Sequence, residues 1–199
     1  MTTLRYFLLY KPHGMLSQFS QEGDKLTLAN LDVDFSGDVY PVGRLDADSE
    51  GLLLLTNDKQ LNHRLLNPKF RHNRTYYVQV EGTLTGEACR ELAQGVTISV
   101  DGKPYQTLPA DARPLLPEPN LPARDPPIRY RARIPTSWLI ISLREGKNRQ
   151  VRKMTTAVGF PTLRLMRWSI ESLTAGEMAP GDVRELSRAE VMRGLKLGF

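Results

Sequence analysis

Cysteine, histidine and long apolar runs are scarce in this chain of 199 residues. The single cysteine, Cys89, cannot form an internal disulfide, and the three histidines, His13, His63 and His72, do not lie at metal-ligand spacing. No apolar stretch approaches the roughly 20 residues that span a bilayer, and the segment before Lys11 has no small-residue cleavage site. We therefore expect a cytoplasmic protein that crosses no membrane, binds no metal and performs no redox chemistry.

Acidic residues are also in the minority. Lys and Arg outnumber Asp and Glu by 27 to 22, which gives a net charge of +5 and a pI near 9.4. Such a balance favours a polyanionic partner such as RNA, above all where the cations gather locally. They do so in two places, which hold Arg64, Lys69, Arg71 and Arg74, and then Arg144, Lys147, Arg149, Arg152 and Lys153.

The spacing of apolar residues predicts short strands with a few helices between them. Strands are expected at residues 6–10, 40–42, 51–55, 76–80, 96–100, near Tyr105, at 129–134, 138–143 and 163–168. Helices are expected from Asn57 or Asp58 to about residue 66, at 86–94 with Gly95 as the stop, at 148–158, and at 188–197 behind a Ser187–Glu190 capping box. This pattern indicates an α+β fold with a mixed, largely antiparallel sheet flanked by helices.

Proline is concentrated in one segment. Residues 109–135 hold eight of the fourteen prolines, so we expect a mostly extended connector or insertion there. The two strands at 129–134 and 138–143 are expected to pair as a hairpin. The length of the chain fits a single domain, residues 1–199, in two lobes, and no internal repeat is present.

The densest chemical signal is the loop from Gly43 to Gly51, which carries three acids and runs into the apolar strand at residues 52–55. A solvated acidic turn is one interpretation, because loops collect Asp, Ser and Gly for conformational reasons. An EF-hand is another, since the spacing of Asp46, Asp48 and Glu50 imitates its opening. We reject it because the twelfth position is Asn57 where a bidentate Glu is required, and strands rather than helices flank the loop.

Adjacent tyrosines open the strand expected at residues 76–80. Side chains alternate along a strand, so Tyr76 and Tyr77 should point to opposite faces, one into the core and one toward a ligand. With Arg74 beside it, an exposed ring suits stacking on an extruded base, although two ordinary strand tyrosines would look the same.

A glycine turn and a basic helix follow the strand at 138–143. Arg149, Arg152 and Lys153 share one helix face by their three-and-four spacing, while Val151, Met154, Thr155 and Val158 form the inward side. A basic helix is often only a solvated face, but the turn at Gly146 brings backbone amides and cations together, which favours contact with phosphates.

Taken in order, these motifs resemble the bacterial ribosomal RNA pseudouridine synthases of the small-subunit synthase A family. Lys11-Pro12-His13-Gly14 resembles the Lys-Pro-x-Gly start of that family, and residues 43–58 resemble its Gly-Arg-Leu-Asp catalytic segment, apolar strand and Thr-Asn-Asp. The resemblance covers nearly the whole chain. It implies the catalytic fold of the family, with two lobes and the active-site cleft between them.

The resemblance also implies roles for individual residues. Asp46 is the catalytic nucleophile, Tyr76 stacks on the target uracil, and Arg152 pairs with Asp46 and keeps it ionised. Further substrate contacts fall on Arg44, Arg74, Leu143, Lys147, Arg149 and Lys153, with Leu143 lining the pocket. Two positions depart from the family pattern, Arg74 where many members have Lys and Arg149 where many have His, and both keep hydrogen-bond donors.

Only ten residues precede Lys11, so we expect no N-terminal RNA-binding domain of the S4 type. This resembles the stand-alone members of the family and points to ribosomal RNA of the large subunit as partner. No cofactor is expected, and the protein should be a monomer. The alternatives are a noncatalytic RNA-binding module and an N-glycoside hydrolase.

Overall fold

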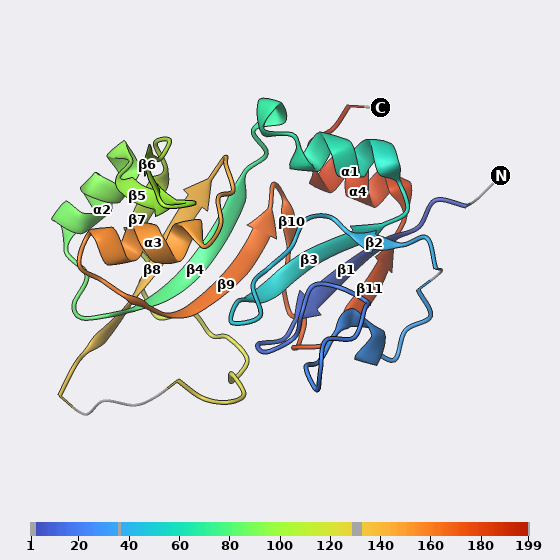
Figure 1. Cartoon of the computed structure of the whole chain (residues 1–199), viewed down its shortest axis with the longest axis horizontal. Coiled ribbons are helices and arrows are strands. Elements are labelled where there is room, and N and C mark those ends of the chain that lie inside the picture. Colours follow the sequence, from blue (N-terminus) through green and yellow to red (C-terminus); the bar gives the residue numbers. More distant parts are fainter. Residues whose placement is uncertain (1–2, 36, 129–132, 199) are drawn as a thin grey trace. The chain divides into compact units, whose positions relative to one another are not determined.

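The computed structural model describes residues 3–35, 37–128 and 133–198 (Figure 1). The chain forms two compact units. Unit 1 consists of residues 1–72 and 167–199, and unit 2 of residues 73–166.

Unit 1 is built on antiparallel strands. β1 (Tyr6–Lys11) pairs with β3 (Glu50–Thr56) on one edge and β11 (Val183–Leu186) on the other, and β2 (Tyr40–Pro41) pairs with the end of β3. β1 and β3 are buried along their whole length. Alternate residues of these strands, Phe7, Leu9, Leu53 and Leu55, pack with Met15, Leu28 and Val39 in one core cluster. This explains why the Leu52–Leu55 run is continuously apolar, since both faces of the strand are covered.

Two helices complete unit 1, and local signals define where each begins. α1 (Lys59–Leu66) starts at Asp58, whose carboxylate accepts hydrogen bonds from the amides of Gln60 and Leu61. The hydroxyl of Tyr6 donates to the same carboxylate at 2.9 Å, which links β1 to the helix start. α4 (Arg188–Gly194) opens with the expected capping box of Ser187 and Glu190. Short 3₁₀ turns lie at η1 (Leu28–Asn30) and η2 (Pro68–Phe70).

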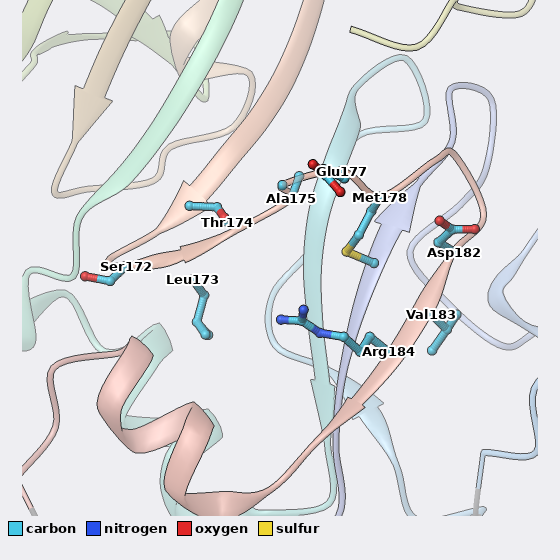
Figure 2. A pocket seen from close by; sticks show the side chains of 10 residues that line it. Ser172, Leu173, Thr174, Ala175, Glu177, Met178, Asp182, Val183 and Arg184 are labelled. Carbon is cyan, nitrogen blue, oxygen red and sulfur yellow. The ribbon is translucent and has the colours of Figure 1, made fainter.

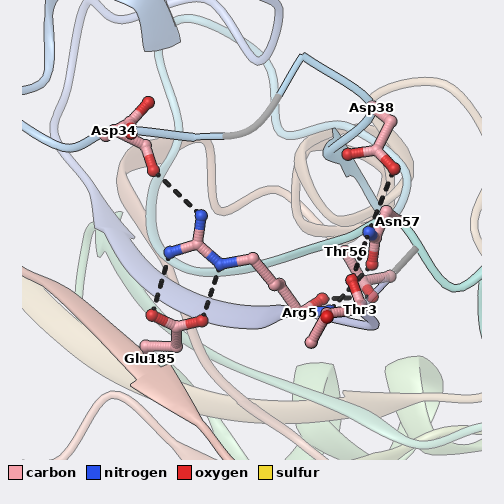
Figure 3. Close-up of polar contacts among 7 residues, drawn as sticks. All are labelled: Thr3, Arg5, Asp34, Asp38, Thr56, Asn57 and Glu185. Carbon is pink, nitrogen blue, oxygen red and sulfur yellow. Dashed lines mark hydrogen bonds and ion pairs between the residues drawn. The ribbon is translucent and has the colours of Figure 1, made fainter. Parts of the chain in front are cut away.

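Arg5 ties the rim of unit 1 together. Its guanidinium donates two hydrogen bonds to the carboxylate of Glu185, at 2.8 and 3.0 Å, and a third to the carbonyl of Asp34 (Figure 3). Its backbone amide donates to the side chain of Asn57. The hydrogen bond from Arg5 lowers the pKa of the Glu185 carboxyl. Three distant segments are thereby joined to the start of β1.

Unit 2 has a second antiparallel set, in the order β4, β8, β7. β4 (Arg74–Glu81) pairs with β8 (Thr136–Leu143), which pairs in turn with β7 (Asp111–Pro114). A separate hairpin consists of β5 (Thr97–Val100) and β6 (Lys103–Gln106). β9 (Thr162–Ile170) contributes residues to both units, and β10 (Leu173–Thr174) pairs with its end in unit 1.

Helices α2 (Gly86–Gln94) and α3 (Gln150–Ala157) supply apolar side chains to the core of unit 2. The buried cluster contains Val78, Val80, Cys89, Leu92, Ile98, Leu139, Ile141, Leu143, Val151, Met154 and Leu165. α2 ends at Gly95 as expected. Its φ of +92° favours glycine, and a Cβ there would collide with the carbonyl oxygen of Thr107.

The expected fold class is confirmed, since the strand pairs given above are antiparallel and helices accompany them in both units. The proline segment contains the short strand β7, which was not expected. β8 has β4 and β7 on its two edges, where a hairpin with residues 129–134 was expected. Of the expected hairpin partner, residues 129–132 lie outside the described residues. β11 and β10 were not expected.

Candidate active site

The loop between β2 and β3 carries Asp46 and is held in place on both sides of that residue. The hydroxyl of Ser17 donates to the carbonyl of Leu45 at 2.8 Å and accepts from the Leu45 amide at 3.0 Å. The amide of Gly14 donates to the carbonyl of Ala47 at 2.7 Å, and the amide of Ser49 closes a turn onto the carbonyl of Asp46 at 3.0 Å. The backbone position of Asp46 is therefore fixed by the segment that follows β1.

The acids of this loop differ in exposure. Glu50 is 1% exposed at the start of β3, whereas the side chains of Asp46 and Asp48 remain partly accessible. Arg44 points its side chain to solvent at an exposed position. The burial of Ser49 and Glu50, together with the hydrogen bonds around Asp46, shows that the loop is packed against unit 1 and is not a fully solvated turn. The strands β2 and β3 flank the loop, as the rejection of an EF-hand required.

A buried lysine lies beside these acids. Lys11 is 0% exposed, and its ammonium donates to the carbonyls of Pro12 at 2.9 Å and Met15 at 2.7 Å. Burial lowers the pKa of Lys11 to about 8, and the charges of Glu50, Asp48 and Asp46 oppose that shift. Its hydrogen bonds hold residues 12–15, and Gly14 in that segment donates to the Asp46 loop.

In unit 2, β4 presents the two tyrosines on opposite faces, as alternation predicted. Tyr76 packs partly against the buried cluster that includes Val78 and remains half-buried. Burial raises the pKa of the Tyr77 hydroxyl, which the charge of Arg113 partly counteracts. The pairing of β4 with β8 sets Tyr76 opposite Ile141 and, two residues away, Arg74 opposite Leu143.

The segment after β8 forms the expected basic turn and helix, with one correction. α3 begins at Gln150, and Arg149 is its N-cap in the left-handed conformation, with φ of 52°. Arg149 therefore does not share a helical face with Arg152 and Lys153, because the chain turns before the helix starts. Lys147 and Arg149 are exposed, and Arg152 and Lys153 are partly buried.

The inward side of α3 was expected correctly for Val151, Met154 and Thr155, which are buried, while Val158 is partly buried and lies just beyond the helix. Leu143 is only 2% exposed and belongs to the core cluster of unit 2.

A buried carboxylate anchors the basic turn. Glu145 accepts hydrogen bonds from the hydroxyl of Tyr105 at 2.6 Å, the amide of Leu108 at 2.8 Å and the side-chain amide of Gln150 at 2.6 Å. Gln150 also accepts from the amide of Lys147 at 2.9 Å. The hydrogen bond to Glu145 raises the pKa of the Tyr105 hydroxyl. The turn between Glu145 and Gln150 is thus preformed, with its cations outward.

The ammonium of Lys147 lies 4.8 Å from the centre of the Tyr105 ring, within cation–π range. Sequence reasoning missed this anchor. Tyr105, Glu145 and Gln150 are distant or polar positions with no shared pattern, and only β6, the turn and α3 together bring them into contact.

Outside the predicted site residues, a hollow, a group of metal ligands or a membrane-spanning helix would each indicate a further function. A hollow of about 430 Å³ in unit 1 is lined by residues between Ser172 and Arg184, and none of the predicted site residues line it (Figure 2). Within the described ranges, no group of three or more His, Cys, Asp or Glu side chains could hold a metal ion. Among the same residues no helix has the length and apolar character to cross a membrane.

Comparison with known proteins agrees with this arrangement of motifs. The sequence profile of the RNA pseudouridylate synthase family matches residues 5–157, which include every predicted site residue. The chain belongs to this family. The synthase is accordingly an isomerase that converts uridine in RNA to pseudouridine.

Several relatives are similar along most of the synthase. Ribosomal large subunit pseudouridine synthase E of Xanthomonas axonopodis pv. citri is 49% identical over 87% of this chain and 89% of its own length. The protein of the same name from Vibrio vulnificus is 45% identical over 92% of this chain and 75% of its own. Ribosomal large subunit pseudouridine synthase B of Bacillus subtilis is 35% identical over 94% and 70%.

A solved structure described as a pseudouridylate synthase superposes on the synthase with a TM-score of 0.78, at 27% identity, over 98% of this chain and 75% of its own. Human RNA Pseudouridylate Synthase Domain Containing 1, with 20% identity and a TM-score of 0.52 over 87% of this chain and 67% of its own, shares the fold alone.

The predicted site residues of the synthase fall into both units. Unit 1 holds Arg44 and Asp46, and unit 2 holds Arg74, Tyr76, Leu143, Lys147, Arg149, Arg152 and Lys153. The register of β4 and β8 brings Arg74, Tyr76 and Leu143 to one end of that strand pair, where the basic turn begins. The pairing of Asp46 with Arg152 stays a prediction.

Proposed function

We propose that this synthase isomerises a uridine of large-subunit ribosomal RNA, with Asp46 as the nucleophile. Support for the substrate comes from relatives at 45–49% identity that are named ribosomal large subunit pseudouridine synthases. Support for Asp46 comes from one observation above the others. Hydrogen bonds hold the residues on both sides of it, while its own carboxylate remains partly accessible.

The reaction needs one ionised carboxylate and no net change of atoms. The N-glycosidic bond of the uridine breaks, the uracil turns, and a bond from the ribose to C5 replaces the one to N1, while the C5 proton is lost and N1 gains a proton. Asp46 acts as nucleophile or base in this sequence, in a site that keeps the detached uracil from escaping.

We assign supporting roles to residues of unit 2. Tyr76 stacks on the extruded uracil, which offsets part of the few kcal/mol that unstacking costs, because base stacking contributes roughly 1 to 3 kcal/mol. Arg152 pairs with Asp46 and orients its carboxylate through the planar donors of the guanidinium. Lys147, Arg149 and Lys153 contact RNA phosphates, and the Glu145 anchor holds the turn that carries the first two.

The proposal also covers the location, the oligomeric state and the cofactor requirement of the synthase. The synthase acts as a cytoplasmic monomer with a single catalytic domain in two lobes. It needs no cofactor, since the isomerisation neither oxidises nor reduces the substrate.

The decisive experiment incubates the purified protein with a large-subunit ribosomal RNA transcript and analyses the digested RNA by mass spectrometry and chromatography. A synthase converts one uridine into an isomer of equal mass. Free uracil with an abasic RNA would indicate an N-glycoside hydrolase, and unchanged uridine with retained binding would indicate a noncatalytic module.

Asp46→Asn supplies the residue test. The amide has nearly the same shape but is neither nucleophilic nor basic, so conversion should fall below a few per cent of wild type while folding and RNA binding persist. Asp48→Asn serves as the matched control and should remain active. Loss in Asp48→Asn alone would move the nucleophile by two residues.

A further inference from the structure

Unit 1 carries an exposed aromatic side chain among cations, outside the residues assigned above. Phe70, at the end of η2, is 43% exposed, and the guanidinium of Arg64 lies 5.4 Å from the centre of its ring. Lys69 and Arg71 on either side are also exposed. We name these four residues, Arg64, Lys69, Phe70 and Arg71, the Phe70 platform.

The charged residues that neighbour the platform in the sequence are all basic. Positions 59–80 contain no Asp or Glu, while Lys59, Arg64, Lys69, Arg71 and Arg74 fall among them. One acid from elsewhere in the chain, Glu171, has its carboxylate 3.6 Å from His72 and 3.8 Å from Lys196. A local excess of cations around an exposed ring is complementary to a polyanion whose units carry flat bases.

The backbone at the platform is also unusual. Arg71 closes η2 in the left-handed conformation, with φ of 49° and ψ of 43°, which a residue with a side chain rarely adopts. The ring of His72, next along the chain, lies 6.4 Å from the ring of Phe70 at a tilt of 31°. Because His72 is 8% exposed, the ring that solvent reaches at this place is that of Phe70.

We infer that the Phe70 platform is a second RNA contact, which stacks an unpaired base of the substrate RNA on Phe70 and Arg64 and binds the flanking phosphates through Lys69 and Arg71. The inference rests on the proposed function, because it names a further contact to the same RNA. An unpaired base fits the observations better than a duplex, since a base inside a helix has no free face for the ring or the guanidinium plane.

The platform acts on binding and not on the chemical step. Stacking of one base changes affinity by about 5- to 150-fold, so Phe70→Ala should weaken binding of a large-subunit ribosomal RNA transcript within that range. The single-turnover rate at saturating RNA should stay within about twofold of wild type. Phe70→Tyr keeps an aromatic face and should bind nearly as wild type does.

The matched control is Tyr40→Ala. Tyr40 lies in the same unit and is 57% exposed, so its removal takes an exposed ring from a hollow that is lined by the acid Asp38 as well as by Lys59. Binding by Tyr40→Ala should be unchanged. Arg64→Gln should weaken binding and reduce the slope of log affinity against log salt, because it removes a cation from the platform.

The outcomes separate this inference from the proposed function. Wild-type activity on the transcript, together with Phe70→Ala affinity equal to that of wild type, would overturn the platform and leave the proposed function intact. Equal losses in Phe70→Ala and Phe70→Tyr would also overturn it, since stacking survives in the second. If the wild-type protein converts no uridine, and Phe70→Ala nevertheless binds the transcript more weakly than wild type does, the isomerase proposal is overturned and the platform stands.

Discussion

Lys11 should make the protein more stable as the pH rises from 7 to 9.5, a trend that replacement by Met should abolish. The side chain is 0% exposed, and burial lowers the pKa of its ammonium from 10.5 in the unfolded chain to about 8. Below pH 8 both states bind the proton. Between about pH 8 and 10.5 the unfolded state binds more protons than the folded state, so the free energy of unfolding increases with pH.

The magnitude follows from these two pKa values. Integrating the difference in bound protons from pH 7 to pH 9.5 gives a gain of about 2 kcal/mol in the free energy of unfolding. The pKa of Tyr6, raised to about 12 mainly by burial, opposes this gain only above the ordinary tyrosine pKa of 10. Its contribution below pH 9.5 is a few tenths of a kcal/mol at most.

The assay is urea unfolding followed by tryptophan fluorescence at several pH values between 7 and 9.5. At each pH, the free energy of unfolding of Lys11→Met is subtracted from that of wild type. The change of this difference with pH reports the titration of Lys11, because the contributions of the other groups cancel. Lys25→Met is the matched control, since Lys25 is exposed and should leave the wild-type trend unchanged. Parallel curves for wild type and Lys11→Met would refute the reasoning, because Lys11 would then titrate alike in both states.

The remaining predictions concern the proposed site. Tyr76→Phe should keep much of the activity and Tyr76→Leu should lose most of it, because stacking needs an aromatic face. Steady-state conversion of the RNA transcript measures both variants. The same pattern at Tyr77 instead of Tyr76 would contradict the assignment. Arg152→Met should lose most of the activity and keep RNA binding, because it removes the proposed partner of Asp46. Arg152→Lys should keep more activity than Arg152→Met because it retains the charge, at a lower maximal rate because it loses the planar pair of donors. A loss matched by equally weaker RNA binding would make Arg152 a phosphate contact. Arg149→Gln or Lys153→Gln should each reduce the slope of log affinity against log salt by about 0.7 to 0.9 per lost phosphate contact, and unchanged slopes would show that neither residue meets RNA.

Local signals predicted the elements whose ends are decided by their own residues. Asp58 and the Ser187–Glu190 pair open helices, and Gly95 ends one, through hydrogen bonds and backbone conformations within a few positions. The helix ends expected at these residues were therefore correct, whereas α4 stops at Gly194, three residues before the expected end. The strand β7 was missed because its place between prolines depends on β8, which is distant in sequence. Arg149 was placed on a helix face because helical spacing does not reveal where the left-handed N-cap begins.

The sequence by itself determined the α+β class, the loop that carries Asp46, the opposite faces of Tyr76 and Tyr77, and the resemblance to pseudouridine synthases. Each of these depends on short spacing or on motifs that stay together along the chain. The tertiary structure alone decided that Lys11 is buried and that Glu145 anchors the basic turn. β1, which carries Lys11, is paired with β3, where Gly51 lies opposite Lys11, and two of the groups that bond Glu145 belong to Tyr105 and Leu108, far back along the chain. No pattern in the neighbouring sequence shows which distant groups will meet these residues.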